Sequence, residues 1–155
     1  MKRFLILFIL GLLTIDYTNG CRCVFTPLQD SFCNSDFVIK IKVTDTGKTQ
    51  ESIKNIYHID ILETYRANPE AVEALKLKYF LTNPDGASCG LPLNRDQVAV
   101  VGGHIIDGKP SIGLCNLNIE NPQEIDAESV NLRENFSKNC ATASTILQTN
   151  LRRSK

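Results

Sequence analysis

The sequence lacks the residues and motifs that several classes of protein need. It has no tryptophan, one methionine and two histidines, and its 17 basic residues are balanced by 17 acidic ones. This balance excludes the basic excess of a nucleic-acid-binding protein, because the only basic cluster is the tail at residues 152–155. Neither histidine falls in a motif such as HExxH or GxSxG, and there is no glycine-rich phosphate loop.

The single long apolar run lies at the amino terminus. Lys2 and Arg3 precede about ten mostly apolar residues at positions 4–13, roughly half the length that crosses a bilayer. Small or polar residues follow as far as Gly20, so residues 1–20 are predicted to be a secretory signal peptide. Cleavage there would leave a secreted, nearly neutral protein, with one domain at residues 21–140 and a short tail at 141–155. We expect a monomer with no membrane segment.

All six cysteines lie beyond the predicted signal peptide. In an oxidising compartment an even number of cysteines indicates three disulfides, although spacing alone leaves many pairings open. The cysteines are Cys21, Cys23, Cys33, Cys89, Cys115 and Cys140. Their wide separation means that some of the bridges must close long loops.

Alternating apolar and polar residues predict five strands followed by a helix. The strands are expected at residues 37–43, 53–62, 75–81, 97–101 and 111–117. One helical turn is expected at residues 70–74, an exposed loop at residues 83–86, and a tight hairpin turn at Asp107 and Gly108. Asn121 and Pro122 resemble the start of a helix with an apolar stripe at Val130, Leu132 and Phe136. These elements predict a mainly β protein, a small closed antiparallel barrel packed by carboxy-terminal helices.

The residues supply no assembled catalytic group. His58 falls inside a predicted strand and His104 in a turn, and disulfide formation would leave no free thiol. Metal binding by Cys21 and Cys23 is the weaker alternative to structural disulfides in a secreted chain. Asn135 begins an N-glycosylation sequon, within a predicted helix. No cofactor of the protein's own is expected.

The most unusual feature is the position of Cys21 at the predicted mature terminus. A cysteine there has a free α-amino group while a disulfide holds its side chain, so the terminus would be rigid. The run from Cys21 to Val24 (CRCV) is followed by FCNSD at residues 32–36 and an apolar strand. Together with Ser88, Cys89 and Gly90 and the later cysteines, it resembles the tissue inhibitors of metalloproteinases from Cys21 to about Cys140.

The resemblance implies a netrin-like module with an OB-type five-stranded barrel. It also implies the pairing Cys21 with Cys89, Cys23 with Cys115 and Cys33 with Cys140. The function it implies is inhibition of zinc metalloproteinases, with the backbone amine and carbonyl of Cys21 binding the zinc of the target. The residues implied to contact the protease are Cys21, Arg22, Cys23, Val24, Ala87, Ser88, Cys89 and Gly90.

Two differences from the family pattern limit what the resemblance implies for this chain. Where this chain has Arg22, the family usually has a small, often hydroxyl-bearing residue, and the side chain of that small residue enters the S1′ pocket of the protease. The six-cysteine carboxy-terminal domain of the family has no counterpart after Cys140, so its functions are not expected here. The alternative function is a netrin-like extracellular binding module that inhibits nothing. A small secreted hydrolase is a third class, for which the sequence offers no nucleophile and base.

Overall fold

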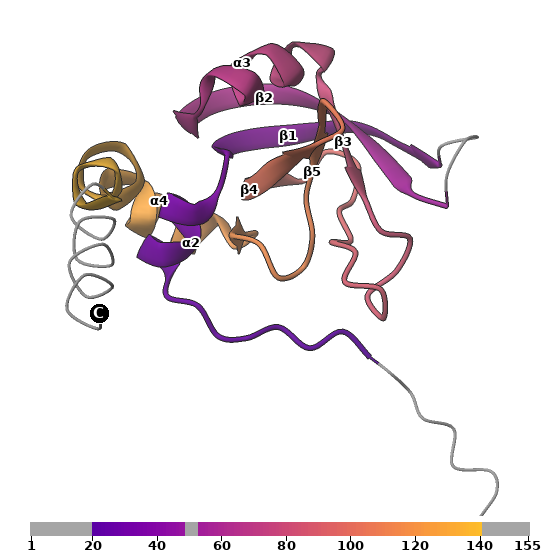
Figure 1. The fold of residues 1–155 in the computed structure, drawn as a ribbon, viewed down its shortest axis with the longest axis horizontal. Coiled ribbons are helices and arrows are strands. Elements are labelled where there is room, and N and C mark those ends of the chain that lie inside the picture. The colour runs from indigo at the N-terminus through magenta and orange to yellow at the C-terminus, as the bar shows by residue number, and fades with distance from the viewer. Residues whose placement is uncertain (1–19, 49–52, 141–155) are drawn as a thin grey trace, which may run out of the picture.

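The computed structural model describes residues 20–48 and 53–140, and a closed five-stranded barrel forms their centre (Figure 1). The strands are joined in the order β1-β2-β3-β5-β4, and pairing between β1 and β4 closes the ring. All of these pairs are antiparallel except β3 with β5. The strands are β1 (Phe37–Lys48), β2 (Asn55–Ala67), β3 (Tyr79–Thr82), β4 (Val98–Ile106) and β5 (Lys109–Ser111). The predicted barrel is therefore confirmed, and a short β6 (Asn118–Ile119) pairs with β4 outside it.

Helices cover the barrel at two places (Figure 1). The helix α3 (Pro69–Ala74) runs into a 3₁₀ turn, η1 (Leu75–Leu77), and lies over β2. At the other place α2 (Leu28–Asn34) lies beside α4 (Pro122–Val130), which continues as a π-helical turn, η2 (Asn131–Asn135). None of the helices in the described ranges has the length and apolar character to cross a membrane.

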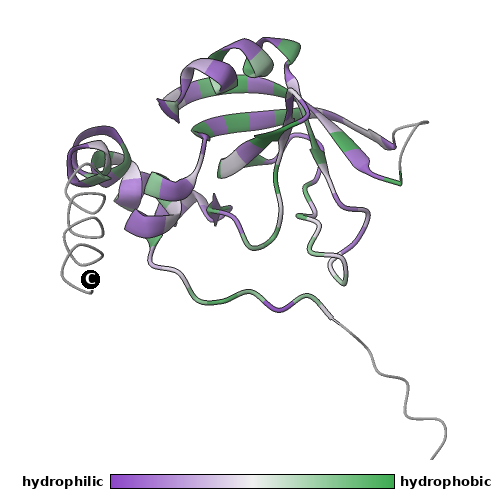
Figure 2. Cartoon of the chain, in the orientation of Figure 1, coloured by the Kyte–Doolittle hydropathy of each residue, from purple (hydrophilic) through white to green (hydrophobic). Residues whose placement is uncertain are grey.

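Two hydrophobic clusters hold these layers together. Apolar residues alternate with polar ones along β1, as the green and purple bands in Figure 2 show. Phe37, Ile39, Ile41 and Val43 are fully buried inside the barrel, as the sequence predicted. Val38 belongs to the opposite face of β1 and is also buried, because α2 and α4 pack there. The barrel therefore has a filled interior and one covered outer face.

The hairpin turn and the start of α4 confirm local predictions, and α3 starts in a similar way. Asp107 and Gly108 have φ values of 52° and 70° and form the two-residue turn between β4 and β5. The Asn121 side chain accepts a hydrogen bond from the Gln123 amide at 2.9 Å, with Pro122 in the first helical turn. The Asn68 side chain caps α3 in the same way, because its Oδ1 accepts a hydrogen bond from the Ala71 amide at 2.8 Å.

The prediction of a strand over residues 75–81 was wrong in its first half. Once Asn68 and Pro69 start α3, the helix continues through η1, and Lys78 then takes a left-handed conformation with φ of 53°. The strand begins only at Tyr79, and Phe80 is its fully buried residue. Alternating leucines and lysines fit a strand and a short helix about equally well.

The last predicted strand, residues 111–117, was also wrong. Only Ser111 belongs to a strand, because the chain then turns at Gly113, whose carbonyl accepts a hydrogen bond from the Asn116 amide.

The predicted bounds of the second strand and of the apolar stripe in the last helix were partly wrong. The second strand begins after Ile53, which is 87% exposed, and it continues to Ala67. In the apolar stripe of the last helix, Leu132 and Phe136 are buried as predicted but Val130 is 56% exposed.

The helix α2 was not predicted. It has only seven residues, too few to show a helical period, and its stability comes from tertiary contacts. Phe32 is fully buried and packs edge-on against Phe136, with 5.4 Å between ring centroids. The Cys33–Cys140 disulfide joins the same two helical segments.

An ion pair ties the last helix to the barrel. Arg133 on η2 donates to both carboxylate oxygens of Glu63 on β2, at 2.5 and 2.9 Å. Arg133 lowers the pKa of the Glu63 carboxyl, and burial beside that carboxylate raises the pKa of Tyr65 to about 12. Because the Glu63 pKa falls on folding, the pair stabilises the protein above the unfolded pKa of Glu63 and loses its effect as the pH falls through the folded pKa.

This ion pair gives a prediction about the pH dependence of stability. Glu63→Gln should lower the free energy of unfolding at pH 7, because the charged pair is lost. Urea titrations at pH 7 and at acid pH should show the difference between the variant and the wild type shrinking as the pH falls below the folded pKa of Glu63, because the carboxyl is then protonated in both states. An equal difference at both values of pH would show that the effect comes from packing and not from charge.

Candidate functional site

The amino-terminal segment, residues 20–26, has no regular structure and runs beneath the barrel (Figure 1). Two disulfides attach it: Cys21 to Cys89 and Cys23 to Cys115, with Cα atoms 5.0 and 5.2 Å apart. The two bridges touch, since Cys21 Sγ lies 3.6 Å from Cys115 Sγ. The residues on either side of Arg22 are therefore fixed, and all three bridges join the pairs that the resemblance implied.

The loop that receives Cys21 is built by short-range hydrogen bonds. Asp85 accepts from the amide and the hydroxyl of Ser88, both at 2.8 Å, and these bonds lower the pKa of its carboxyl. Asn83 donates to the Ser88 carbonyl at 2.5 Å. A Cβ on Gly90 would lie 2.1 Å from the carbonyl oxygen of Asn83, so only glycine allows the loop to close this tightly. Ala87 and Ser88 are left exposed at its tip.

Cys89 connects this loop to the segment that carries the second bridge. Its φ of 63° places the backbone of Cys89 in the left-handed region, which residues other than glycine seldom adopt. Its carbonyl accepts a hydrogen bond from the amide of Leu114 at 2.9 Å, one residue before Cys115. The loop, the segment at Gly113–Cys115 and the amino-terminal segment are thus one unit held by two disulfides and a backbone hydrogen bond.

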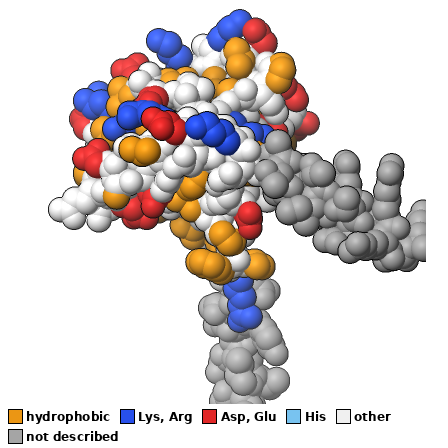
Figure 3. Space-filling view, turned by 90° about the vertical axis from the view of Figure 1, so that its left-hand side faces the viewer, with side chains coloured by type: hydrophobic (Ala, Val, Ile, Leu, Met, Phe, Trp, Pro, Cys, Tyr) orange, Lys and Arg blue, Asp and Glu red, His pale blue; other side chains and the backbone are white. Residues whose placement is uncertain are grey.

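This unit carries apolar side chains that the barrel does not cover. Val24 is 88% exposed and Phe25 is 90% exposed, and Leu114 is 38% exposed beside Cys115. Figure 3 shows hydrophobic side chains gathered on this projection, with a basic side chain beyond them next to the grey residues. We call Arg22 to Phe25 together with residues 87–89 and Leu114 the ridge. An exposed apolar ridge of this kind is typical of a protein-binding surface.

The structure brings the predicted contact residues close together, with Gly90 buried and the others exposed or half-buried. Cys21 to Val24 and Ala87 to Gly90 are joined directly by the first bridge. Phe25 and Leu114 are exposed beside them and are not among the predicted residues. Phe25 is an aromatic residue in a segment with no strand or helix pattern, which is a signal of exposure, whereas Leu114 lies within the predicted strand at residues 111–117.

Asp36, the last residue of the FCNSD run, lies between α2 and β1 and is hydrogen-bonded to neighbouring elements. Its carboxylate accepts from the side chain of Asn68 at 2.9 Å and from the amide of Ile105 at 3.0 Å. The Asp36 amide donates to the Gly103 carbonyl at 2.9 Å. One side chain thereby fixes α2, α3 and β4 relative to each other, a role that the sequence motif did not reveal.

The two histidines have structural surroundings. His58 on β2 lies edge-on to Tyr79, with 6.4 Å between the ring centroids. His104 Nδ1 on β4 lies 3.4 Å from Asp36 Oδ2. The sulfurs of Cys21, Cys23 and Cys115 lie within 4.8 Å of one another, but each belongs to a disulfide and none is a thiolate ligand. Asn135 is exposed on η2, so its glycosylation stays a prediction.

Comparison with known proteins identifies the family. The family described as tissue inhibitor of metalloproteinase matches residues 19–149. The tissue inhibitor of metalloproteinase of Drosophila melanogaster is 27% identical over 84% of this chain and 59% of its own length. Metalloproteinase inhibitor 3 of Xenopus laevis is 31% identical over 64% of this chain and 46% of its own, and metalloproteinase inhibitor 4 of Mus musculus is 27% identical over 79% and 58%. The chain spans about half the length of these relatives.

Proposed function

Since the chain belongs to the tissue inhibitors of metalloproteinases, we propose that it is a secreted inhibitor of zinc metalloproteinases that acts through the α-amino group of Cys21. The observation that carries the proposal is the ridge itself. Two touching disulfides fix Cys21 and Cys23 in an exposed segment, next to uncovered apolar side chains. The proposal includes removal of residues 1–20, of which residues 1–19 lie outside the described part of the chain.

The proposed mechanism is chelation of the zinc of the target protease. A catalytic zinc is held by three protein ligands and keeps one position for water. The neutral amine and the carbonyl oxygen of Cys21 would displace that water. An α-amino group has a reference pKa of about 7.7 to 8, so losing its proton on binding costs little near neutral pH.

The rigidity of the segment contributes to affinity. A flexible peptide entering a cleft loses conformational freedom, whereas a segment fixed by bridges at Cys21 and Cys23 has already lost most of it on folding. Val24 and Phe25 would then contribute apolar contact beside the zinc, and Ala87 and Ser88 would contact the rim of the cleft. A cleft that accepts this projection as a wedge is the partner that the ridge fits best.

Arg22 lies between the two bridged cysteines, and we propose that it redirects specificity. Its side chain would enter the S1′ pocket, and a guanidinium buried there without a partner would be costly. The preferred target is therefore a metalloproteinase whose pocket is deep, solvated or acidic. Proteases with short apolar pockets should be inhibited weakly.

The prediction from this argument concerns Arg22→Thr. Against a panel of zinc metalloproteinases, the variant should gain about tenfold or more toward enzymes with apolar pockets and lose affinity toward enzymes with acidic ones. The panel should include both classes, and the thermal stability of the variant should match that of the wild type because Arg22 is exposed. Inhibition constants that do not change for any enzyme would reject the role of Arg22.

The rival function, a netrin-like binding module, makes a different prediction about processing. Inhibition by chelation requires Cys21 to be the first residue of the secreted protein. Intact-mass measurement and amino-terminal sequencing of the protein from culture medium would find Cys21 first under the inhibitor proposal. A start upstream of Cys21 would favour the binding module, since the amine would then be part of an amide.

A further inference from the structure

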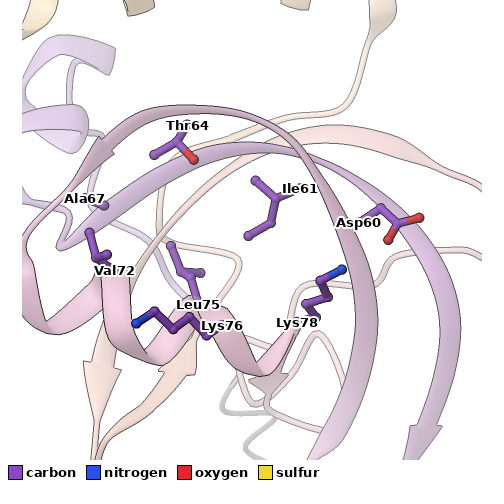
Figure 4. Close-up of a pocket in the computed structure, with 8 residues that line it drawn as sticks. All are labelled: Asp60, Ile61, Thr64, Ala67, Val72, Leu75, Lys76 and Lys78. Atoms are coloured by element: carbon purple, nitrogen blue, oxygen red, sulfur yellow. The ribbon is translucent and has the colours of Figure 1, made fainter.

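A groove on the described part of the protein lies away from the ridge. It has a volume of about 550 Å³ and is bounded by β2 on one side and by α3 and η1 on the other (Figure 4). In Figure 1 these elements lie on the opposite side of the barrel from the amino-terminal segment. Its size falls within the range of small-molecule sites in proteins, roughly 300 to 1,000 Å³. We call it the β2–α3 groove.

The floor of the β2–α3 groove is apolar. Ile61 and Ala67 on β2 face Val72 on α3 and Leu75 at the start of η1 across the space (Figure 4). Ile61 and Ala67 also pack against the core cluster of the barrel, which includes Leu75. Val72 is 49% exposed, so part of the apolar lining is open to water. An aliphatic chain lying here would cover this surface and extend the packing of the core.

Besides the hydroxyl of Thr64, the polar groups of the groove are two cations and one anion. Lys76, Lys78 and Asp60 line it. Lys76 is paired with Glu73 at 2.6 Å and lies along the helix. Lys78 has no ion pair within the described ranges, and Figure 4 shows its amine directed into the space between β2 and η1. Of the two lysines that line the groove, Lys78 is therefore the one without an ion pair, and it lies at the mouth of the apolar space.

The backbone holds Lys78 firmly in an uncommon conformation. Its φ of 53° is left-handed, which glycine or asparagine adopts more cheaply than lysine. Its amide donates to the Leu75 carbonyl at 3.1 Å, and its carbonyl accepts from the Ile59 amide at 2.9 Å. These bonds fix the stem of the side chain to both walls of the groove. A strained residue whose side chain points into a groove is a candidate for a binding function.

From these observations we propose that the β2–α3 groove binds a single-chain amphiphile with an anionic head group, of the class of long-chain carboxylates. The alkyl chain lies on Ile61, Val72 and Leu75, and the carboxylate pairs with the Lys78 amine. Asp60, at the same end, opposes the anion and limits the affinity. The site is independent of the ridge, so binding here leaves protease inhibition unchanged.

The test measures binding of dodecanoate, below its micellar concentration, to the full secreted protein by calorimetry. Lys78→Asn removes the amine while favouring the left-handed backbone, so the fold is kept. It should weaken binding about fivefold, the effect of one partly exposed ion pair. Asp60→Asn should strengthen binding, and added salt should weaken it. Lys109→Gln, an exposed lysine on β5, serves as the matched control and should bind like the wild type.

Three outcomes would overturn the proposal. They are the absence of saturable dodecanoate binding, equal binding of dodecyltrimethylammonium, and unchanged affinity in Lys78→Asn. Val72→Glu, which places an acid at an exposed position of the floor, should abolish binding without unfolding the protein. Inhibition assays with and without dodecanoate test the two sites separately. Loss of dodecanoate binding should leave protease inhibition unchanged, and loss of inhibition should leave dodecanoate binding unchanged.

Discussion

Addition of one alanine before Cys21 is expected to abolish inhibition while leaving the fold intact. The added residue turns the α-amino group into an amide, whose nitrogen lone pair is delocalised and binds zinc poorly. It also introduces a side chain where the zinc should lie. The loss of one metal ligand should raise the inhibition constant by at least about a hundredfold to a thousandfold, or roughly 3 to 4 kcal/mol. Titration of both forms against a susceptible zinc protease measures the two inhibition constants.

The matched control for this experiment is the same protein after trimming. Removal of the added alanine by an aminopeptidase restores the Cys21 amine without refolding, so inhibition should return. Circular dichroism and thermal unfolding should be the same for both forms, because the terminus of the segment is exposed. Equal inhibition by the extended and trimmed forms would exclude chelation, and the ridge would then have to act by blocking the cleft alone.

The barrel could be predicted because its strands carry strong local signals. Along β1 four buried apolar residues alternate with Lys40 and Lys42, and the turn at Asp107 and Gly108 needs the two residue types that accept positive φ. The helix at Asn121 and Pro122 has a cap that is visible in the sequence. In each case the interactions that select the structure lie within a few residues of one another.

The errors came where tertiary contacts decide the local structure. Residues 75–77 alternate like a strand but follow a capped helix, so they continue it as η1. Residues 112–117 look apolar enough for a strand, yet the hydrogen bond from Leu114 to Cys89 and the bridge at Cys115 hold them in an irregular path. The short α2 is stabilised by Phe136, more than 100 residues away in the sequence.

The candidate site was predictable from its cysteines more than from its shape. The position of Cys21 and Cys23 at the predicted terminus indicated a fixed amine, and the family resemblance implied which cysteines they meet. Neither revealed that the two bridges touch, or that Phe25 stands 90% exposed beside them. Exposure depends on what the rest of the fold fails to cover, and no local pattern in the sequence records it.

The disulfides offer a comparison that separates stability from function. Cys23 and Cys115 are 92 residues apart, and Cys33 and Cys140 are 107 apart. Removing either bridge by a double Cys→Ala substitution should cost a similar amount, up to about 4 kcal/mol, because the closed loops are of similar length. Urea unfolding of the two variants measures this loss, with the wild type as reference.

The two variants should differ in inhibition. Without the Cys23–Cys115 bridge, the segment is held only at Cys21, so its freedom must be lost on binding and the inhibition constant should rise by about tenfold to a hundredfold. Without the Cys33–Cys140 bridge, the last helix is released but both bridges at the ridge remain, so inhibition at a temperature where the variant is folded should stay within about twofold of wild type. Equal losses in both variants would mean that inhibition follows global stability, and the rigidity of the ridge would then have no separate role in binding.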